Sequence, residues 1–314
     1  MARTMAERDA TSSSGAAGTS PMRYVVGYGA DKRSKEAVRL AAALAQAFHA
    51  ELEIVYVVRS GDPFSTAYPP VGDISPVVRR EAVSWLKDAE ALVPDGVVAR
   101  SHVRTAQSIA EGLVSAVQEF DAGLLVVGAA AGKYGVKFSV GPVVDALLHR
   151  APVPVAMAPR GYRATEPITR LYAGVGARRG AQQILRESQE AVERGGQELV
   201  LLNFLPLDQV ADEPEAAVAA TDAMLREAAR ELPGEHRVSV HVATGKNFRR
   251  TVADMNWAPG SVLFVGSSRL AQHRQIFLGT TAARVLRHLP VPMIILPQSA
   301  HPDSRQGATE EVPR

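Results

Sequence analysis

The sequence contains no cysteine, and its charge is nearly balanced. Without cysteine, disulfides, thiolate metal ligands and a cysteine nucleophile are all excluded. The formal net charge of +2 is too small to predict binding to nucleic acid or to an anionic membrane. No uninterrupted apolar run approaches the roughly 18 residues of a membrane helix, and residues 1–20 lack the apolar centre of a signal peptide. We therefore expect a cytoplasmic protein with neither nucleic-acid nor membrane partners.

The motifs of several enzyme classes are missing as well. There is no phosphate loop of the G-x-x-x-x-G-K-[ST] type, no G-x-S-x-G nucleophile elbow and no histidine-rich metal motif. His102 and His241 fall on corresponding predicted strands, which repeat symmetry or packing explains better than catalysis. The basic cluster of Lys246, Arg249 and Arg250 is interpreted as a solvated helix start, since it lacks interleaved aromatic residues. We predict no catalytic residue and no metal ligand, and therefore do not expect an enzyme.

What the sequence does contain is a duplication. The segment Val126-Val127-Gly128 is followed by Gly141-Pro142 and then by Pro152-Val153-Pro154. The pattern returns as Phe264-Val265-Gly266, Gly279-Thr280 and Pro290-Val291-Pro292. The offset is 138 residues at all three points, as positions 266 against 128, 279 against 141 and 290 against 152 show. Each copy thus places an apolar strand, a glycine, a loop, a glycine that opens a helix, and a final strand in the same order.

Apolar strands and amphipathic helices alternate through both copies, which predicts parallel sheets with right-handed crossovers. The fold class is therefore α/β, with two tandem doubly wound, Rossmann-like domains that pack as a pseudo-dimer. We expect domains at 21–160 and 166–298, between a disordered leader at 1–20 and a disordered tail at 299–314. The Pro-Val-Pro end strands, expected at Val153–Ala158 and Val291–Leu296, offer edges for pairing, because the apolar Val291–Leu296 would be costly to leave exposed.

A ligand site of such a sheet lies beyond the carboxyl ends of its strands, at the switch in strand order. In the second copy this edge holds Gly266, Ser267 and Arg269, and then Gly279 and Thr280 at a helix start. Glycine allows close backbone approach, and threonine there either caps the helix or donates to a phosphate. The Arg269 guanidinium suits a bidentate phosphate contact, but a structural or outward role is the competing interpretation.

The equivalent edge of the first copy carries Gly128, Gly141 and Pro142. Proline is comfortable in the first helical turn, but it removes a backbone N–H that an anion would use. Lys133 and Lys137 lie in the same loop and are interpreted as solvated. The first site is therefore predicted to be the weaker one.

These motifs resemble the universal stress protein (UspA) family, in the tandem form common in actinobacteria. The family signature is Gly-x2-Gly-x9-Gly followed by Ser or Thr. The second copy reads Gly266-x2-Arg269-x9-Gly279-Thr280 and the first Gly128-x2-Ala131-x9-Gly141-Pro142, so both keep the spacing and lose the middle glycine. Members that bind ATP also carry Asp after the first strand. Here that position is Gly29 in the first copy and Gly176 in the second, with Asp31 two residues further on as a partial substitute or a plain helix cap.

The resemblance implies a non-catalytic stress-response module. If it binds ATP, with Mg²⁺, or a related adenine nucleotide, the contacts lie mainly in the second domain. Two alternatives stay open: a nucleotide-free dimerisation scaffold that has lost the site, and a slow ATPase. Further homodimerisation of the tandem chain is also left open.

Overall fold

The structure is a computed structural model. It describes residues 21–60, 75–130, 141–176, 181–210, 213–234, 237–266, 285 and 287–297. The predicted leader and tail lie outside these residues, as do most of the helix expected after Gly279-Thr280 and the loop that holds Lys133 and Lys137.

The first repeat alternates strand and helix, as its sequence predicts. Helix α1 begins after Asp31, whose carboxylate accepts a hydrogen bond from the N–H of Ser34, and it ends at His49 in the left-handed conformation. The elements are β1 (Met22–Tyr28), α1 (Lys32–Phe48), β2 (Ala50–Arg59), α2 (Ser75–Glu90), β3 (Ala99–Ala106), α3 (Ile109–Glu119), β4 (Leu124–Gly128), α4 (Pro142–Arg150) and β5 (Val155–Ala158).

The second repeat follows the same order, and a 3₁₀ turn (Leu207–Gln209) comes after its second strand. Its elements are β6 (Arg170–Gly174), α5 (Ala181–Gly195), β7 (Glu198–Pro206), α6 (Pro214–Arg230), β8 (Val238–Gly245), α7 (Phe248–Ala253), β9 (Ser261–Gly266) and β10 (Met293–Leu296).

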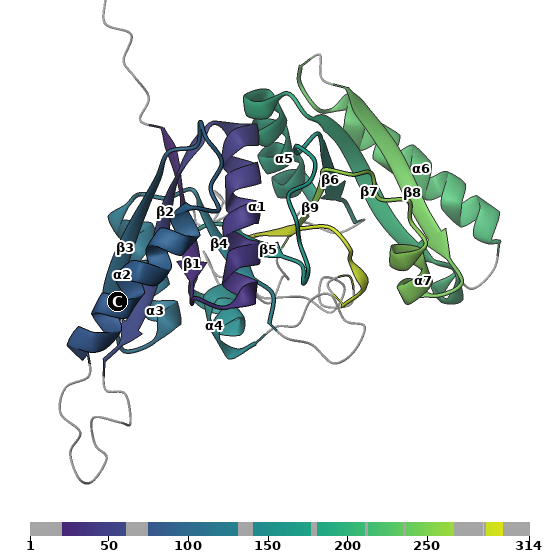
Figure 1. The fold of residues 1–314 in the computed structure, drawn as a ribbon. Helices are drawn as coiled ribbons and strands as arrows, with labels where there is room; N and C mark the ends of the chain where they lie inside the picture. The colour runs from purple at the N-terminus through teal and green to yellow at the C-terminus, as the bar shows by residue number, and fades with distance from the viewer. Residues whose placement is uncertain are drawn as a thin grey trace, which may run out of the picture.

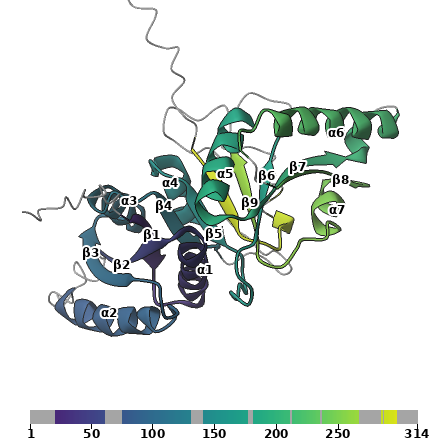
Figure 2. The ribbon, with the colours of Figure 1, turned by 90° about the horizontal axis from the view of Figure 1, so that it is seen from above.

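In the described part of the chain, the strands of both repeats join one ten-stranded sheet in the order β3-β2-β1-β4-β5-β10-β9-β6-β7-β8. Among these strands, pairing is parallel within each repeat and antiparallel where β5 meets β10, with Ala156 opposite Ile294. Figure 2 shows yellow β10 between the purple-to-teal elements of the first repeat and the green elements of the second. The predicted pseudo-dimer is therefore built by pairing of the two end strands.

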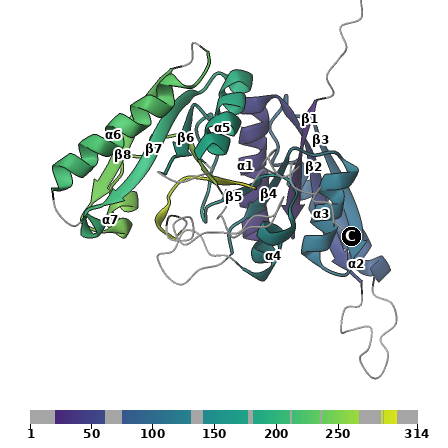
Figure 3. The ribbon, with the colours of Figure 1, turned by 180° about the vertical axis from the view of Figure 1, so that it is seen from behind.

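The apolar residues form two layers, one on each face of the sheet. One layer contains buried residues of α1, α2, α5 and α6, and the other contains those of α3, α4 and α7 with Val285 and Leu289. Figure 1 views the first repeat from the α1–α2 side, and Figure 3 shows α3 and α4 from behind. Both faces of β4 and β9 are covered, which explains their unbroken apolar runs Leu124–Val127 and Val262–Val265.

The end strands begin later than predicted. Val153 and Val291 were expected within strands, but β5 begins at Val155 and β10 at Met293. Proline has no N–H to give to a ladder, so regular pairing starts only after the second proline of each motif. The carbonyl oxygens of those prolines are used: Pro154 accepts from the N–H of Leu125 at 3.0 Å, and Pro292 from that of Leu263 at 2.9 Å.

Candidate functional site

Each repeat has one point where the strand order reverses. In the first it lies between β1 and β4, and in the second between β6 and β9, which pair in parallel from Arg170 opposite Ser261 to Ala173 opposite Phe264. The carboxyl ends of such a strand pair open the crevice in which α/β sheets hold ligands. We call these two places the first and the second carboxyl edge.

At the second carboxyl edge, the chain leaves β6 through Val175 and Gly176. Two hydrogen bonds fix this turn: the N–H of Val175 donates to the carbonyl of Leu202 at 2.8 Å, and the Asn203 amide donates to the carbonyl of Val175 at 2.7 Å. A Cβ built on Gly176 would have no atom of the described residues within 4 Å. The backbone here is therefore held in place, and none of the described residues fills the space beside Gly176. The sequence prediction missed Asn203, although a polar residue on the otherwise apolar strand β7 was a usable signal.

Gly266 ends the neighbouring strand β9. A Cβ there would lie 3.2 Å from Cδ1 of Ile184, which is the flexible tip of a side chain on α5. The structure thus brings Gly176 and Gly266 to the same edge, as predicted. Ser267, Arg269, Gly279 and Thr280, the other predicted contacts of this site, lie outside the described residues.

The glycines of the first carboxyl edge are explained mainly by packing. A Cβ on Gly128 would lie 2.2 Å from the carbonyl oxygen of Arg33, so β4 can approach the start of α1 only with glycine at this position. A Cβ on Gly141 would lie 2.8 Å from Cβ of Ala130. Gly29 alone resembles its counterpart Gly176, since a Cβ there would meet nothing within 4 Å.

Asp31 serves as a helix cap. Its side chain accepts from the Ser34 N–H at 2.8 Å and from Arg33 Nε at 2.8 Å, while the Ser34 hydroxyl accepts from the Asp31 N–H at 3.0 Å. Burial alone would raise the pKa of Asp31, but the hydrogen bonds from Ser34 and Arg33, with the Arg33 charge, outweigh it and lower the pKa. The carboxylate is thus occupied by α1 itself, as the helix-cap interpretation predicts.

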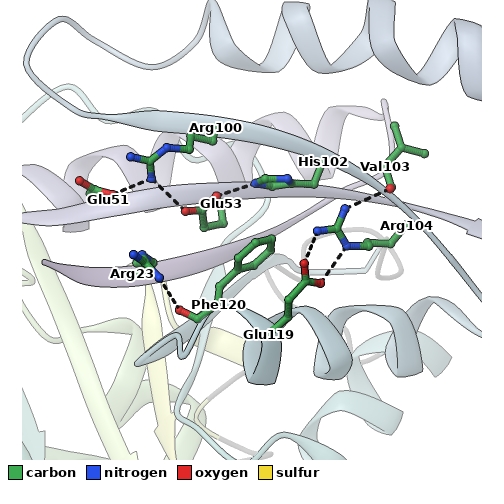
Figure 4. A network of polar contacts seen from close by, with 9 residues as sticks. All are labelled: Arg23, Glu51, Glu53, Arg100, His102, Val103, Arg104, Glu119 and Phe120. Carbon is green, nitrogen blue, oxygen red and sulfur yellow. Dashed lines mark hydrogen bonds and ion pairs between the residues drawn. The ribbon is translucent and has the colours of Figure 1, made fainter. Parts of the chain in front are cut away.

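Figure 4 shows a polar network that the sequence did not predict, between β2, β3 and α3. Glu53 is only 3% exposed; it lies opposite Arg100 in the strand register and contacts it at 3.1 Å, and it pairs with His102 Nε2 at 2.6 Å. The His102 ring packs on Phe120 with centroids 4.6 Å apart. The Arg104 guanidinium lies over the Phe120 ring. It also forms an ion pair with Glu119, and the hydrogen bonds of this pair lower the pKa of Glu119.

The network belongs to the edge strand rather than to the candidate site. Glu53 and Arg100 lie near the starts of β2 and β3, away from the carboxyl edge. In the second repeat, Val200 stands opposite Ser239 at the matching positions, so His241 has no buried glutamate there. The predicted likeness of His102 and His241 therefore extends to their strands but not to their partners.

No cluster of three or more potential metal ligands occurs within the described part of the chain. Among the helices in these ranges, none is both long and apolar enough to cross a bilayer.

Comparison with known proteins agrees with this architecture. The sequence profile of the Universal stress protein family matches residues 22–159 and 168–297. A universal stress protein of Mycobacterium tuberculosis is 28% identical over 291 residues, which cover 88% of this chain and all of that protein. Because the profile matches most of the chain, in two copies, the protein belongs to the universal stress protein family, as a tandem member.

Solved structures support the same fold. A universal stress protein from Archaeoglobus fulgidus superposes with a TM-score of 0.64 at 17% identity and covers 88% of this chain and 98% of its own. A protein of unknown function from Pseudomonas aeruginosa PAO1 gives a TM-score of 0.55 at 17% identity, with 88% and 93% covered. At these identities the likeness concerns the fold alone.

Proposed function

We propose that this protein is a non-catalytic stress-response module that binds an adenine nucleotide such as ATP, with Mg²⁺, in its second domain. The observation that carries the proposal is the difference between the two carboxyl edges. At the second edge, no residue that the structure describes fills the space beside Gly176, and among these residues a Cβ on Gly266 would meet only the Ile184 side chain. At the first edge, Gly128 is required for packing against the Arg33 backbone.

The geometry of the second edge suits a ligand. Hydrogen bonds from Asn203 and Val175 hold the turn after β6 rigidly, so little ordering of this turn is needed on binding. The retained Gly279-Thr280 at a predicted helix start supplies N–H groups of the kind that bind phosphate. A ligand that binds the folded chain but not the unfolded chain stabilises the folded state by mass action. The module can thereby respond to the presence of nucleotide without hydrolysing it.

A matched pair of variants tests this assignment. Gly29 and Gly176 hold the same position in the two repeats, and a Cβ on either meets nothing within 4 Å. Gly176→Trp should fill the second edge and Gly29→Trp the first, each with little cost to the fold. We expect Mg²⁺-ATP to raise the melting temperature of the wild type and of Gly29→Trp, but not of Gly176→Trp.

Other results decide for the alternatives. No thermal shift of the wild type at millimolar ATP would favour a nucleotide-free scaffold held together by the β5–β10 pairing. Loss of the shift in Gly29→Trp alone would place the site in the first domain. Steady phosphate release that Gly279→Trp abolishes would indicate a slow ATPase.

A further inference from the structure

A groove of about 930 Å³ runs along the outer side of α1, from Ala30 and Asp31 at its start toward Gln46. Its walls are α1, the turn after α2 and the linker between the domains, which lies beside α1 in Figure 1. We call it the α1 groove. Its charged lining consists of Lys32, Lys35, Arg39 and Arg163, with Asp31 and Glu36 as the acidic members.

Glu36 is the unusual residue of this groove. Its side chain is 2% exposed, and Oε1 accepts a hydrogen bond from the N–H of Gly161 in the linker at 2.8 Å. Oε2 is buried and has no hydrogen-bond partner among the described residues. Buried polar atoms are almost always paired, so an unpaired carboxylate oxygen in a groove wall indicates a missing donor.

The second repeat carries a neutral side chain at this position. Gln183 occupies the place of Glu36, at the same offset of 147 residues that relates Gly27 to Gly174. Its amide donates to the carbonyl of Pro297, which follows β10 as the linker follows β5. A neutral side chain therefore suffices to tie α5 to the chain after the last strand. The charge of Glu36 is not needed for such a tie.

The cations of the groove are available for a ligand. Within the described ranges, Lys32, Lys35, Arg39 and Arg163 make no side-chain hydrogen bond or ion pair. Lys32 and Arg163 are exposed, and Lys35 and Arg39 are half-buried along one face of α1. Asp31 is already engaged by Arg33 and Ser34, so it neutralises little of this charge.

The remaining lining is apolar and aromatic. Leu92 and Pro94 form part of one wall, and Tyr162 of the linker lies in the other. Burial raises the pKa of Tyr162 to about 12, so its hydroxyl remains a neutral group at physiological pH. An aromatic ring with a neutral hydroxyl suits the C–H face and hydroxyl groups of a sugar.

We propose that the α1 groove binds a phosphorylated sugar or polyol, with a ligand hydroxyl donating to Glu36 Oε2 and its phosphate groups held by Lys35, Arg39 and their neighbours. A ligand with phosphate alone leaves Glu36 unpaired and is repelled by it. A ligand with hydroxyls alone leaves the cations unused. This site is separate from the proposed nucleotide site and does not depend on it.

The test is calorimetric titration of the full chain with fructose 1,6-bisphosphate, fructose and inorganic pyrophosphate at low salt. We expect the bisphosphate to bind the wild type more tightly than either of the other probes. Lys35→Gln/Arg39→Gln should weaken it about tenfold or more, because charge-assisted hydrogen bonds are lost. Arg226→Gln/Arg230→Gln removes the same charge from exposed positions on α6 and should leave the affinity unchanged.

Glu36→Gln distinguishes a built site from simple charge attraction. Glutamine keeps an amide oxygen that accepts from the Gly161 N–H, and circular dichroism checks that the variant folds. We expect it to weaken the bisphosphate severalfold and to strengthen pyrophosphate, since the repulsive charge is gone. Strengthening of both probes, or no bisphosphate binding by the wild type at millimolar concentration, would overturn the proposal. If ATP displaces the bisphosphate one for one, the two ligands share one site, and the proposal of a separate site would be overturned as well.

Discussion

Replacing Gly128 with alanine tests whether the first carboxyl edge is a packing contact. The added Cβ would lie 2.2 Å from the carbonyl oxygen of Arg33 and 2.6 Å from its carbonyl carbon. Both are backbone atoms at the start of α1, which has few ways to yield because Asp31 and Ser34 fix it through a capping box. Overpacking in a core costs about 1–3 kcal/mol, and a backbone clash belongs at the upper end or beyond.

We therefore expect Gly128→Ala to lower the free energy of unfolding by about 3 kcal/mol. At about 2–4 °C per kcal/mol for a domain of this size, the melting temperature should fall by about 6–12 °C. Gly29→Ala is the matched control, because its Cβ meets nothing within 4 Å. It should be neutral or stabilising by up to about 1 kcal/mol, as the unfolded chain loses freedom. Urea unfolding of both variants measures the difference. A Gly128→Ala protein within about 0.5 kcal/mol of the wild type would refute the packing account.

Two further predictions concern polar contacts. Asp31→Ala should cost about 1 kcal/mol through the lost helix cap, while Asp31→Asn keeps most of the capping. Folding lowers the pKa of Asp31, so the Asp31 carboxylate stabilises the fold at pH values above the ordinary carboxyl pKa. This stabilisation is lost as the pH falls through the lowered pKa of the folded state. The acid unfolding curves of wild type and Asp31→Asn should therefore converge in that pH range. Glu53→Ala should cost about 2–3 kcal/mol, chiefly by leaving His102 without its buried acceptor, since Arg100 keeps its contact with Glu51. Glu119→Ala, from an exposed pair, should cost less than about 1 kcal/mol. Equal urea midpoints for these last two variants would contradict the burial argument.

Much of the architecture could be predicted because it depends on patterns local in sequence. The apolar run Leu124–Val127 and its counterpart Val262–Val265 are typical of strands covered on both faces, and they form β4 and β9. The duplicated end strands predicted pairing between the repeats, and β5 and β10 form that pair. The error at Val153 and Val291 arose because the prolines were counted as strand residues.

The parts that could not be predicted depend on the register between strands. Glu53 and Arg100 are 47 positions apart in sequence and meet only because β2 and β3 pair with these residues opposite each other. The role of Gly128 likewise depends on the fold, since the sequence shows a glycine that recurs as Gly266 in the second copy but not the Arg33 carbonyl beside it. The orphan oxygen of Glu36 follows from the path of the linker, which no periodicity reveals.

We propose that the duplicated fold keeps one nucleotide site rather than two. Its most direct test is the stoichiometry of Mg²⁺-ATP binding to the full chain, measured by calorimetry on the wild type and on Gly176→Trp. We predict one nucleotide per chain in the wild type and none in Gly176→Trp. Two nucleotides per chain, none, or one that persists in Gly176→Trp would contradict the account.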